Sequence, residues 1–407
     1  MKSTKNKTKK NKKSTPFPKL DFLNTEIAFA YKSDKELKKA GWLFSLMNKT
    51  WLVNPLSDLG MLAMKMRIPF TQKIVKETMF DQFVGGRTLL ECTPSIEKLY
   101  EHDILTVLDY GAEGKESEKD FNRTMNENIR AIEYATANES TPVVVTKISG
   151  LARTKLLEFL QKKRDDLPED IVEEYKHVIK RLDSICSAAS KNGVAVMVDA
   201  EESWIQDIID YLADVMMKRY NKERVVVYNT FQMYRHDRLQ FLFNSFNKAQ
   251  EEGYLLGAKL VRGAYMEKEN ARAEEMGYPT PIQPNKQATD DAYNMALRFC
   301  LDNYEQIGSC AATHNAESCK IQADIIDEKG IDKKHPHLNF CQLYGMSDNL
   351  TFNLSAAGYN AAKYVVYGQV NEVFPYLVRR AKENTAVSGD MSREYALIKQ
   401  EIDRRKI

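Results

Sequence analysis

The sequence predicts an α/β protein, a (βα)8 TIM-like barrel with an N-terminal helical extension. Three observations predict it: short apolar runs rich in β-branched residues, helix-length polar segments between them, and polar or charged residues at the end of each run. Strands that alternate with helix-length segments indicate a parallel sheet, and eight such units indicate a closed barrel more than an open sheet. The eight predicted strands are 104–110, 142–150, 194–203, 224–232, 254–263, 309–315, 338–346 and 362–370.

The chain begins with a strongly basic stretch, and residues 1–18 are predicted to be a disordered tail. Residues 1–15 hold seven lysines and no acidic residue, and blocks of like charge usually remain solvated. The alternative is weak attachment to anionic lipid or RNA, since clustered lysines contribute about 1 kcal/mol each near an anionic membrane. The rest of the chain has 52 basic against 57 acidic residues, which argues against nucleic-acid binding as its main function.

The sequence between this tail and the first predicted strand has a helical period. We therefore expect a helical N-terminal extension over 19–100, followed by a barrel domain over 101–407. The apolar residues that recur at helical spacing include Leu37, Trp42, Leu43, Leu46 and Met47.

Neither a secretory signal nor a membrane span is expected. The basic tail lacks the apolar core of a secretory signal, and no run approaches the roughly 18 uninterrupted apolar residues of a membrane span. The six cysteines include no CxxC pair and are expected to be reduced thiols. The expected location is the cytoplasm, with peripheral contact at the inner membrane left open.

Motifs of several other enzyme classes are missing from the sequence. No GxGxxG follows a predicted strand, and the GAEGK stretch at 111–115 has too few residues between its glycines for a Walker A loop. The six histidines form no HExxH or HxxxH pattern, and His335 and His337 fall in a polar loop. No metal is expected.

The segment after the last predicted strand carries the strongest local signal for chemistry. Tyr376, Arg379, Arg380 and Glu383 fall on one helical stripe. Paired arginines suit a planar anion such as a carboxylate, which an arginine binds through two parallel hydrogen bonds. The alternative is a solvated basic face, because charged runs usually face water.

Other strand ends add functional groups to the same face of the predicted barrel. Lys147 ends the second predicted strand, Asp199 ends the third, and the run 262–265 (RGAY) ends the fifth. Glycine at a strand end lets the backbone approach a flat ligand closely. Together with the arginine pair, these groups predict a pocket for a small substrate that is anionic at one end and carries an amino group at the other.

From about residue 142 to 385 the chain resembles the proline dehydrogenase family, and particularly its single-function branch. Motifs of this length and order are highly specific, whereas the resemblance over 20–140 is much weaker. The resemblance implies FAD, held non-covalently at the C-terminal end of the barrel. The matching blocks are VTKISG (145–150), VDAEES (198–203), VVYNTFQMY (226–234), GAKLVRGAYMEKENARAEEMGYPTPIQP (257–284), ATHN (312–315), FCQLYGM (340–346) and KYVVYGQVNEVFPYLVRRAKEN (363–384).

The resemblance also implies which residues surround the substrate. Arg379, Arg380 and Lys147 match the groups that hold the proline carboxylate. Tyr364 and Tyr376 match aromatic residues that pack on the pyrrolidine ring.

Four further positions match residues near the substrate and the flavin ring. Leu343 matches another wall of the pocket, and Asp199 matches an acidic residue beneath substrate and flavin. Ala264 and Tyr265 match residues between the substrate and the isoalloxazine ring.

The remaining matches concern the cofactor. Asn229 and Lys259 match contacts to the flavin ring, although bifunctional members usually have Gln and Arg at these positions, and Gly263 belongs to the same cofactor-binding set. Glu383 is expected either to orient the arginines or to reach the cofactor. The region that contacts the ribityl chain and phosphates is matched by Arg262, Thr313, His314 and Asn315.

The function implied is oxidation of L-proline to Δ1-pyrroline-5-carboxylate by hydride transfer to FAD, with electrons passed to an acceptor such as membrane quinone. A separate pyrroline-5-carboxylate dehydrogenase is expected downstream, no nucleic-acid partner is expected, and residues 266–285 are expected to cover the site as a lid. Hydroxyproline oxidation is the nearest alternative. It is disfavoured because that branch tends to replace the residue matching Tyr364 with a small hydroxylic one. A flavin-binding barrel without catalysis, acting as a sensor or scaffold, is the other alternative.

Overall fold

The computed structural model describes residues 17–49, 71–111, 114–386 and 390–407, together with positions 51, 55, 59, 60 and 66. Side chains are described for these residues except those of 382–391. Nearly all of the predicted disordered tail over 1–18 therefore lies outside the described residues.

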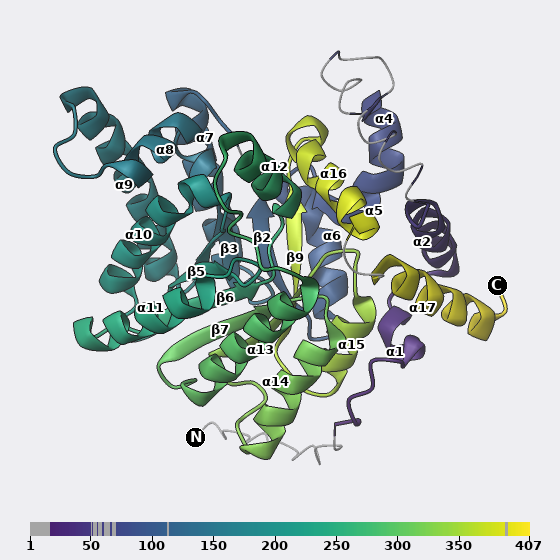
Figure 1. The fold of residues 1–407 in the computed structure, drawn as a ribbon. Coiled ribbons are helices and arrows are strands. Elements are labelled where there is room, and N and C mark those ends of the chain that lie inside the picture. The colour runs from purple at the N-terminus through teal and green to yellow at the C-terminus, as the bar shows by residue number, and fades with distance from the viewer. Residues whose placement is uncertain are drawn as a thin grey trace, which may run out of the picture.

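Eight parallel strands close into a barrel (Figure 1). Each strand from β2 to β8 pairs with the next one, and β9 pairs with both β8 and β2, which closes the sheet. Each of the eight overlaps one predicted run, so the predicted fold class is confirmed. The strands are β2 Leu105–Tyr110, β3 Val143–Thr146, β4 Ala195–Val198, β5 Val227–Gln232, β6 Leu256–Val261, β7 Ile307–Ala312, β8 Leu338–Leu343 and β9 Ala361–Tyr367.

Helices follow the strands and surround the barrel (Figure 1). They are α7 Glu118–Thr136, η2 Ile148–Gly150, α8 Thr154–Lys162, α9 Glu169–Asn192, α10 Ser203–Tyr220, α11 Arg238–Glu252, α12 Met266–Met276, α13 Lys286–Asp302, α14 Ala316–Glu328, α15 Asp348–Ala356 and α16 Val370–Ala386. Two of these, α12 and α13, follow β6, so this crossover is longer than most of the others.

The chain before the barrel contains helices, and the first two of them lie beside the C-terminal helix α17 (Asp390–Arg405). Helix α1 packs on α15, and α2 packs on α17. The domain boundaries predicted at 18/19 and 100/101 stay predictions. The described helices of this region are α1 Thr25–Phe29, α2 Asp34–Met47, α4 Thr71–Val75, the π-helix η1 Lys76–Phe80, α5 Asp81–Phe83 and α6 Leu89–Tyr100.

One residue of the predicted apolar stripe on α2 lies on the wrong face. Leu37, Leu43 and Met47 are buried, but Trp42 is 55% exposed. Trp42 lies five positions after Leu37, which turns its side chain about 140° around the helix axis. Phe44, which lies at helical spacing from Leu37, is buried instead.

A ninth strand was not predicted. Strand β1 (Val84–Gly86) adds a parallel pairing to β9. Its glycines permit close contact, because a Cβ at Gly85 would lie 2.4 Å from a methyl of Val365, and one at Gly86 would lie 2.7 Å from the backbone of Glu91. A three-residue strand with two glycines has no side-chain alternation from which a strand could be predicted.

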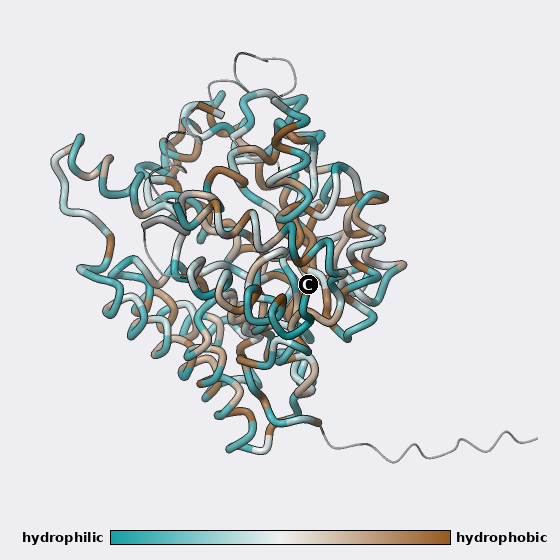
Figure 2. Tube along the Cα trace, turned by 90° about the vertical axis from the view of Figure 1, so that its right-hand side faces the viewer, coloured by the Kyte–Doolittle hydropathy of each residue, from teal (hydrophilic) through white to brown (hydrophobic). Residues whose placement is uncertain are grey.

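The apolar core has two layers. The larger layer lies between the sheet and the helices, where residues such as Val144, Ile185 and Leu212 are fully buried. Figure 2 shows the polar and apolar residues that alternate along the outer helices, as expected for helices with one buried face. The second layer fills the barrel with inward residues such as Val145 and Met197 and continues to the helices before and after the barrel.

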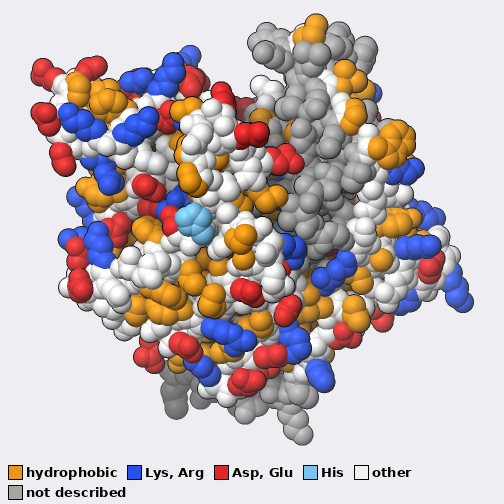
Figure 3. Space-filling view, viewed as in Figure 1, with side chains coloured by type: hydrophobic (Ala, Val, Ile, Leu, Met, Phe, Trp, Pro, Cys, Tyr) orange, Lys and Arg blue, Asp and Glu red, His pale blue; other side chains and the backbone are white. Residues whose placement is uncertain are grey.

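The outer surface carries charges of both signs. On the face seen in Figure 3, acidic and basic side chains are interspersed over the described surface. No helix among the described residues is long and apolar enough to cross a membrane.

Candidate active site

A cavity of about 730 Å³ lies among the carboxyl ends of the eight barrel strands. Residues of α12, of the segment after it and of α16 complete its walls. Active sites of (βα)8 enzymes lie at this end of the barrel, and the volume is typical of ligand and cofactor sites. Every predicted site residue except Asn229 and Glu383 lines the cavity: Lys147, Asp199, Lys259, Arg262, Gly263, Ala264, Tyr265, Thr313, His314, Asn315, Leu343, Tyr364, Tyr376, Arg379 and Arg380.

Five buried side chains from five barrel strands, or from the residue that directly follows a strand, form a polar group, which we call the strand cluster: Asp109, Lys147, Asp199, Lys259 and Tyr364. The ammonium nitrogen of Lys147 lies 2.8 Å from Oδ2 of Asp109 and 3.2 Å from Oδ2 of Asp199. The ammonium group of Lys259 donates to Oδ1 of Asp199. The Tyr364 hydroxyl donates to Oδ2 of the same carboxyl at 2.8 Å.

The protonation states of the strand cluster follow from burial and from the neighbouring charges. Burial raises the pKa of the Asp199 carboxyl, but Lys259 and Lys147 outweigh that effect and hold its pKa well below the usual range. Burial, and then repulsion from Asp109 and Asp199, raise the pKa of Tyr364 well above its usual value. Asp199 is therefore ionised, and Tyr364 keeps the proton that it donates to Asp199.

Helix α16 brings the predicted aromatic and arginine stripe to the cavity. Tyr376 and Arg380 are both less than 10% exposed. The Arg380 guanidinium lies 5.2 Å from the centre of the Tyr376 ring, and the Arg379 guanidinium lies 5.8 Å from the centre of the Tyr265 ring. Because both arginines line the cavity, the alternative of a solvated basic face is wrong.

Arg262, which follows β6, is fixed in place by three neighbours. Its guanidinium donates to Asp290 at 2.6 Å, to the Thr313 hydroxyl at 2.7 Å and to the Ser318 hydroxyl at 3.0 Å. It also lies 4.4 Å from the centre of the Tyr293 ring. These contacts hold one positive charge at a defined point of the cavity wall.

His314 and Asn315 follow β7 at the start of α14. The Nδ1 atom of His314 lies 2.8 Å from the Ser347 hydroxyl oxygen. Burial, followed by the nearby charge of Arg380, lowers the pKa of His314 to about 3, so its ring is neutral. Asn315 caps α14 by accepting a hydrogen bond from the Ser318 amide at 3.0 Å. Among the described residues, no group of three or more His, Cys, Asp or Glu is arranged to hold a metal ion.

Gly263 is required where the chain leaves β6 for α12. Its φ of 137° is rarely adopted by residues with side chains, and a Cβ there would lie 2.4 Å from the Tyr234 ring. The segment that follows lines one side of the cavity, with Met266 and Asn270 from α12 and residues 280 and 282–286 after it. The segment predicted to be a lid therefore forms a cavity wall, while its opening and closing stay a prediction.

The structure does not bring Asn229 into the cavity. Its amide donates to Asp210 on α10 at 2.9 Å, and its oxygen accepts from the Thr230 amide. Successive strand residues face opposite sides of a sheet. Thr230 is paired with the inward-facing Lys259 and lines the cavity, so Asn229 faces the helices, and a direct cofactor contact from its side chain is not supported.

Two further points complete the comparison with the predicted site. The side chain of Glu383 lies outside the described residues. Asp109, Thr230 and Gln232 line the cavity but were not predicted as site residues. The signal for Asp109 was present, since it is an acidic residue at a strand end, but its partner Lys147 could be identified only from the structure.

The chain matches known proteins along most of its length. The family model described as proline dehydrogenase matches residues 92–393. The chain belongs to the proline dehydrogenase family. Proline dehydrogenase 1, mitochondrial, of Drosophila melanogaster is 39% identical over 249 residues, which are 59% of this chain and 37% of that protein. Hydroxyproline dehydrogenase of Xenopus laevis is 31% identical over 366 residues, 81% of this chain and 78% of that protein.

The barrel of this proline dehydrogenase family member also resembles a solved structure. Proline utilization A (PutA) from Bdellovibrio bacteriovorus, inactivated by N-propargylglycine, matches with a TM-score of 0.69 and 20% identity, over 94% of this chain and 38% of that one. At this identity the match supports the fold alone. The chain spans well under half the length of the Drosophila relative and of PutA.

Proposed function

We propose that this chain is an FAD-dependent dehydrogenase that oxidises L-proline to Δ1-pyrroline-5-carboxylate. The observation that carries the proposal is one cavity in which the strand cluster, two arginines of α16 and several tyrosine rings converge. Proline is a small substrate with a carboxylate, a ring nitrogen and an apolar ring. The cavity offers cations, an ionised carboxyl group and aromatic surfaces to match these three parts.

The residues of the cavity fit an anionic flavin cofactor. The basic side chains that line it, Lys147, Lys259, Arg262, Lys286, Arg379 and Arg380, outnumber its carboxyl groups, Asp109 and Asp199. Such an excess of positive charge suits a ligand with a diphosphate and a substrate with a carboxylate. Arg262, Thr313, His314 and Asn315 would hold the ribityl chain and phosphates, and Lys259 would contact the flavin ring. When bound, FAD supplies a two-electron acceptor for hydride.

The protein's own residues position the substrate. Arg379 and Arg380 bind the proline carboxylate, and Tyr376, Tyr364 and Leu343 pack around the pyrrolidine ring. Lys147 adds a third cation, but its ammonium group already contacts Asp109, Asp199 and Tyr364. Lys147 must exchange one of these contacts to hold substrate, so the arginines supply most of the carboxylate binding.

Asp199 stabilises the positive charge that develops as proline loses hydride. Its depressed pKa keeps it ionised at neutral pH, where the arginines and lysines are charged. The lysines and the Tyr364 hydroxyl that surround it are already oriented before substrate arrives. A charge that is oriented in advance needs no reorganisation during the reaction, which is the usual source of electrostatic catalysis.

An anaerobic absorbance titration tests the proposal. The purified protein, reconstituted with FAD if required, should show oxidised flavin absorbance that bleaches on addition of L-proline. Bound flavin that stays oxidised with proline would refute the substrate, and a protein that never binds FAD would refute the cofactor.

Hydroxyproline remains the second candidate because a relative that matches 81% of this chain bears that name. Tyr364 argues for proline, since its buried ring and its hydroxyl bond to Asp199 occupy the space that a ring hydroxyl would need. The same titration with hydroxyproline separates the two, because bleaching at lower concentration than with L-proline would reverse the assignment.

The partners are inferred from the reaction. Reduced flavin needs an electron acceptor, and we propose membrane quinone, reached by peripheral contact with the inner membrane. The second oxidation, of pyrroline-5-carboxylate, is assigned to a separate dehydrogenase. Anaerobic turnover with a soluble quinone analogue tests the first assignment, and failure of the analogue to reoxidise the bleached flavin would refute it.

A further inference from the structure

Helix α12 reaches the cavity only at its start. Tyr265 occupies the position just before the helix and lines the cavity together with Met266 and Asn270. Glu269 lies between Met266 and Asn270 in the chain but does not line the cavity. It is completely buried although it carries a carboxyl group. A buried carboxyl group needs strong hydrogen-bond partners, because leaving it unsatisfied costs several kcal/mol.

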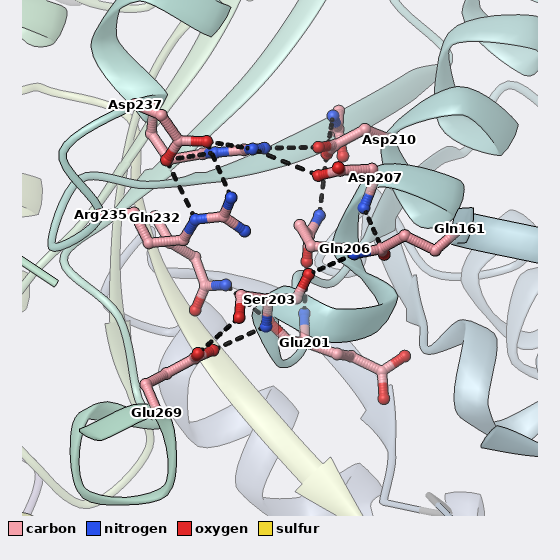
Figure 4. Close-up of polar contacts among 12 residues, drawn as sticks. Gln161, Glu201, Ser203, Gln206, Asp207, Asp210, Gln232, Arg235, Asp237 and Glu269 are labelled. Carbon is pink, nitrogen blue, oxygen red and sulfur yellow. Dashed lines mark hydrogen bonds and ion pairs between the residues drawn. The ribbon is translucent and has the colours of Figure 1, made fainter. Parts of the chain in front are cut away.

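The partner of Glu269 is Ser203, the first residue of α10. Both oxygens of Glu269 are used: Oε1 accepts from the Ser203 amide at 2.6 Å, and Oε2 accepts from the Ser203 hydroxyl at 2.5 Å (Figure 4). The first amides of a helix have no partner within the helix and attract negative charge. Glu269 therefore caps α10 from another element of the fold.

This contact joins two walls of the cavity. Ser203 lies four residues after Asp199, and the stretch between them is held by further hydrogen bonds. The Glu201 amide donates to Gln206 at 2.7 Å, and the Gln232 amide group donates to the Glu201 carbonyl at 2.8 Å (Figure 4). The turn that carries Asp199 is thus fixed, and Glu269 ties α12 to it.

Two neighbours of Glu269 support the same contact from the surface. Lys268 pairs with Glu202 at 2.8 Å, and the Arg272 guanidinium lies 4.3 Å from the centre of the Trp204 ring. Lys268 is 61% exposed, and exposed ion pairs contribute little stability. Of these three residues of α12, Glu269 is the one that is completely buried.

We propose that Glu269 is a positioning residue that holds the α12 wall, and with it Tyr265 and Asn270, in register with Asp199. Neither Glu269 nor Ser203 lines the cavity, so the effect is transmitted through α12. The expected effect of losing the Glu269–Ser203 contact on enzyme kinetics rests on the proposed function. The expected effect on the mobility of α12 does not.

Amide hydrogen exchange of the full-length protein, read in peptides that cover α12, tests the proposal. In Glu269→Gln an amide NH₂ replaces one of two oxygens that face donors, so exchange in α12 should quicken about tenfold or more. Ser203→Ala should give a smaller increase, and Ser203→Thr, which keeps the hydroxyl, should restore slow exchange. Glu275→Gln makes the same chemical change at an exposed position of the same helix and should leave exchange unchanged.

Two results would overturn the proposal. One is unchanged exchange in α12 of Glu269→Gln. The other is an equal increase in α12 and in the distant helix α7, which would indicate general destabilisation. Exchange requires neither flavin nor proline, so a failed function assignment leaves this result intact. If the protein oxidises proline, Glu269→Gln should also raise KM severalfold while kcat recovers at saturating proline, because substrate binding selects the docked α12.

Discussion

Replacing Gly263 with alanine should strongly destabilise the protein. A residue with a side chain held at a φ of 137° is strained by about 1–3 kcal/mol. The added Cβ would lie 2.4 Å from the Tyr234 ring, far inside normal carbon contact. Relief requires a shift of the ring or the backbone, and overpacking of this kind costs about 1–3 kcal/mol. The expected loss of stability is therefore about 2–6 kcal/mol.

Gly277→Ala is the matched control for this substitution. Gly277 also has a positive φ, 71°, but a Cβ there would meet no heavy atom within 4 Å. Its expected cost is about 1–2 kcal/mol, from backbone conformation alone. Denaturant unfolding of both variants and the wild type measures the difference. If Gly263→Ala loses no more stability than Gly277→Ala, the close contact with Tyr234 does not constrain the chain as we argue.

Three further substitutions test the site and its surroundings. Arg380→Lys keeps the positive charge but loses the planar guanidinium that can donate two parallel hydrogen bonds. Steady-state kinetics should therefore show a KM for proline about tenfold higher or more. An unchanged KM would exclude a contact between Arg380 and the substrate carboxylate. Ionised Asp199 contributes stability above its unfolded pKa near 4, and this stability is lost as pH falls through its lower folded pKa. Tyr364→Phe removes a donor and raises that folded pKa, so acid unfolding followed by circular dichroism should begin at higher pH than in the wild type. Burial raises the pKa of Glu394 to about 7, so its contribution to stability is complete below its unfolded pKa near 4 and lost as pH rises through 7. Between pH 4 and 8 the wild type should therefore lose about 3 kcal/mol of unfolding free energy that Glu394→Gln does not lose. Denaturant unfolding of both proteins across this pH range measures the difference, and parallel curves of stability against pH would contradict the prediction.

The fold could be predicted because each barrel strand has an apolar body and a polar end. The run that contains Val143–Thr146 followed by Lys147 is an example: the apolar part forms the strand, and the lysine emerges at the cavity. Strand β1 could not be predicted, because its three residues gain stability only from pairing with β9. The face on which Trp42 lies depends on the exact rotation of α2, which the spacing of apolar residues determined only approximately.

Site residues could be predicted where a charged side chain stands in an otherwise apolar segment. They could not be predicted where the assignment depends on which of two neighbouring strand residues faces the barrel interior. A lysine or an arginine pair at the end of an apolar strand or helix has few structural explanations, and Lys147, Arg379 and Arg380 all line the cavity. Asn229 and Thr230 are both polar neighbours on β5, and nothing in their chemistry tells which one faces inward. The pairing of Thr230 with Lys259 decides it.

The strand cluster is better explained by ligand binding than by stability. Removing the charges of Asp199, Lys147 and Lys259 from water costs several kcal/mol per ion, and their mutual attraction offsets that cost only in part. Apolar side chains of similar size would fill the same space without this cost. The apolar layer beneath the cluster, which includes Val145 and Met197, shows that the barrel interior does pack in that way below the cavity. The ionised side chains that point into the barrel, Asp109, Lys147, Asp199 and Lys259, line the cavity. We infer that folding energy maintains them as an oriented set of charges for the proposed substrate and cofactor, before either one binds.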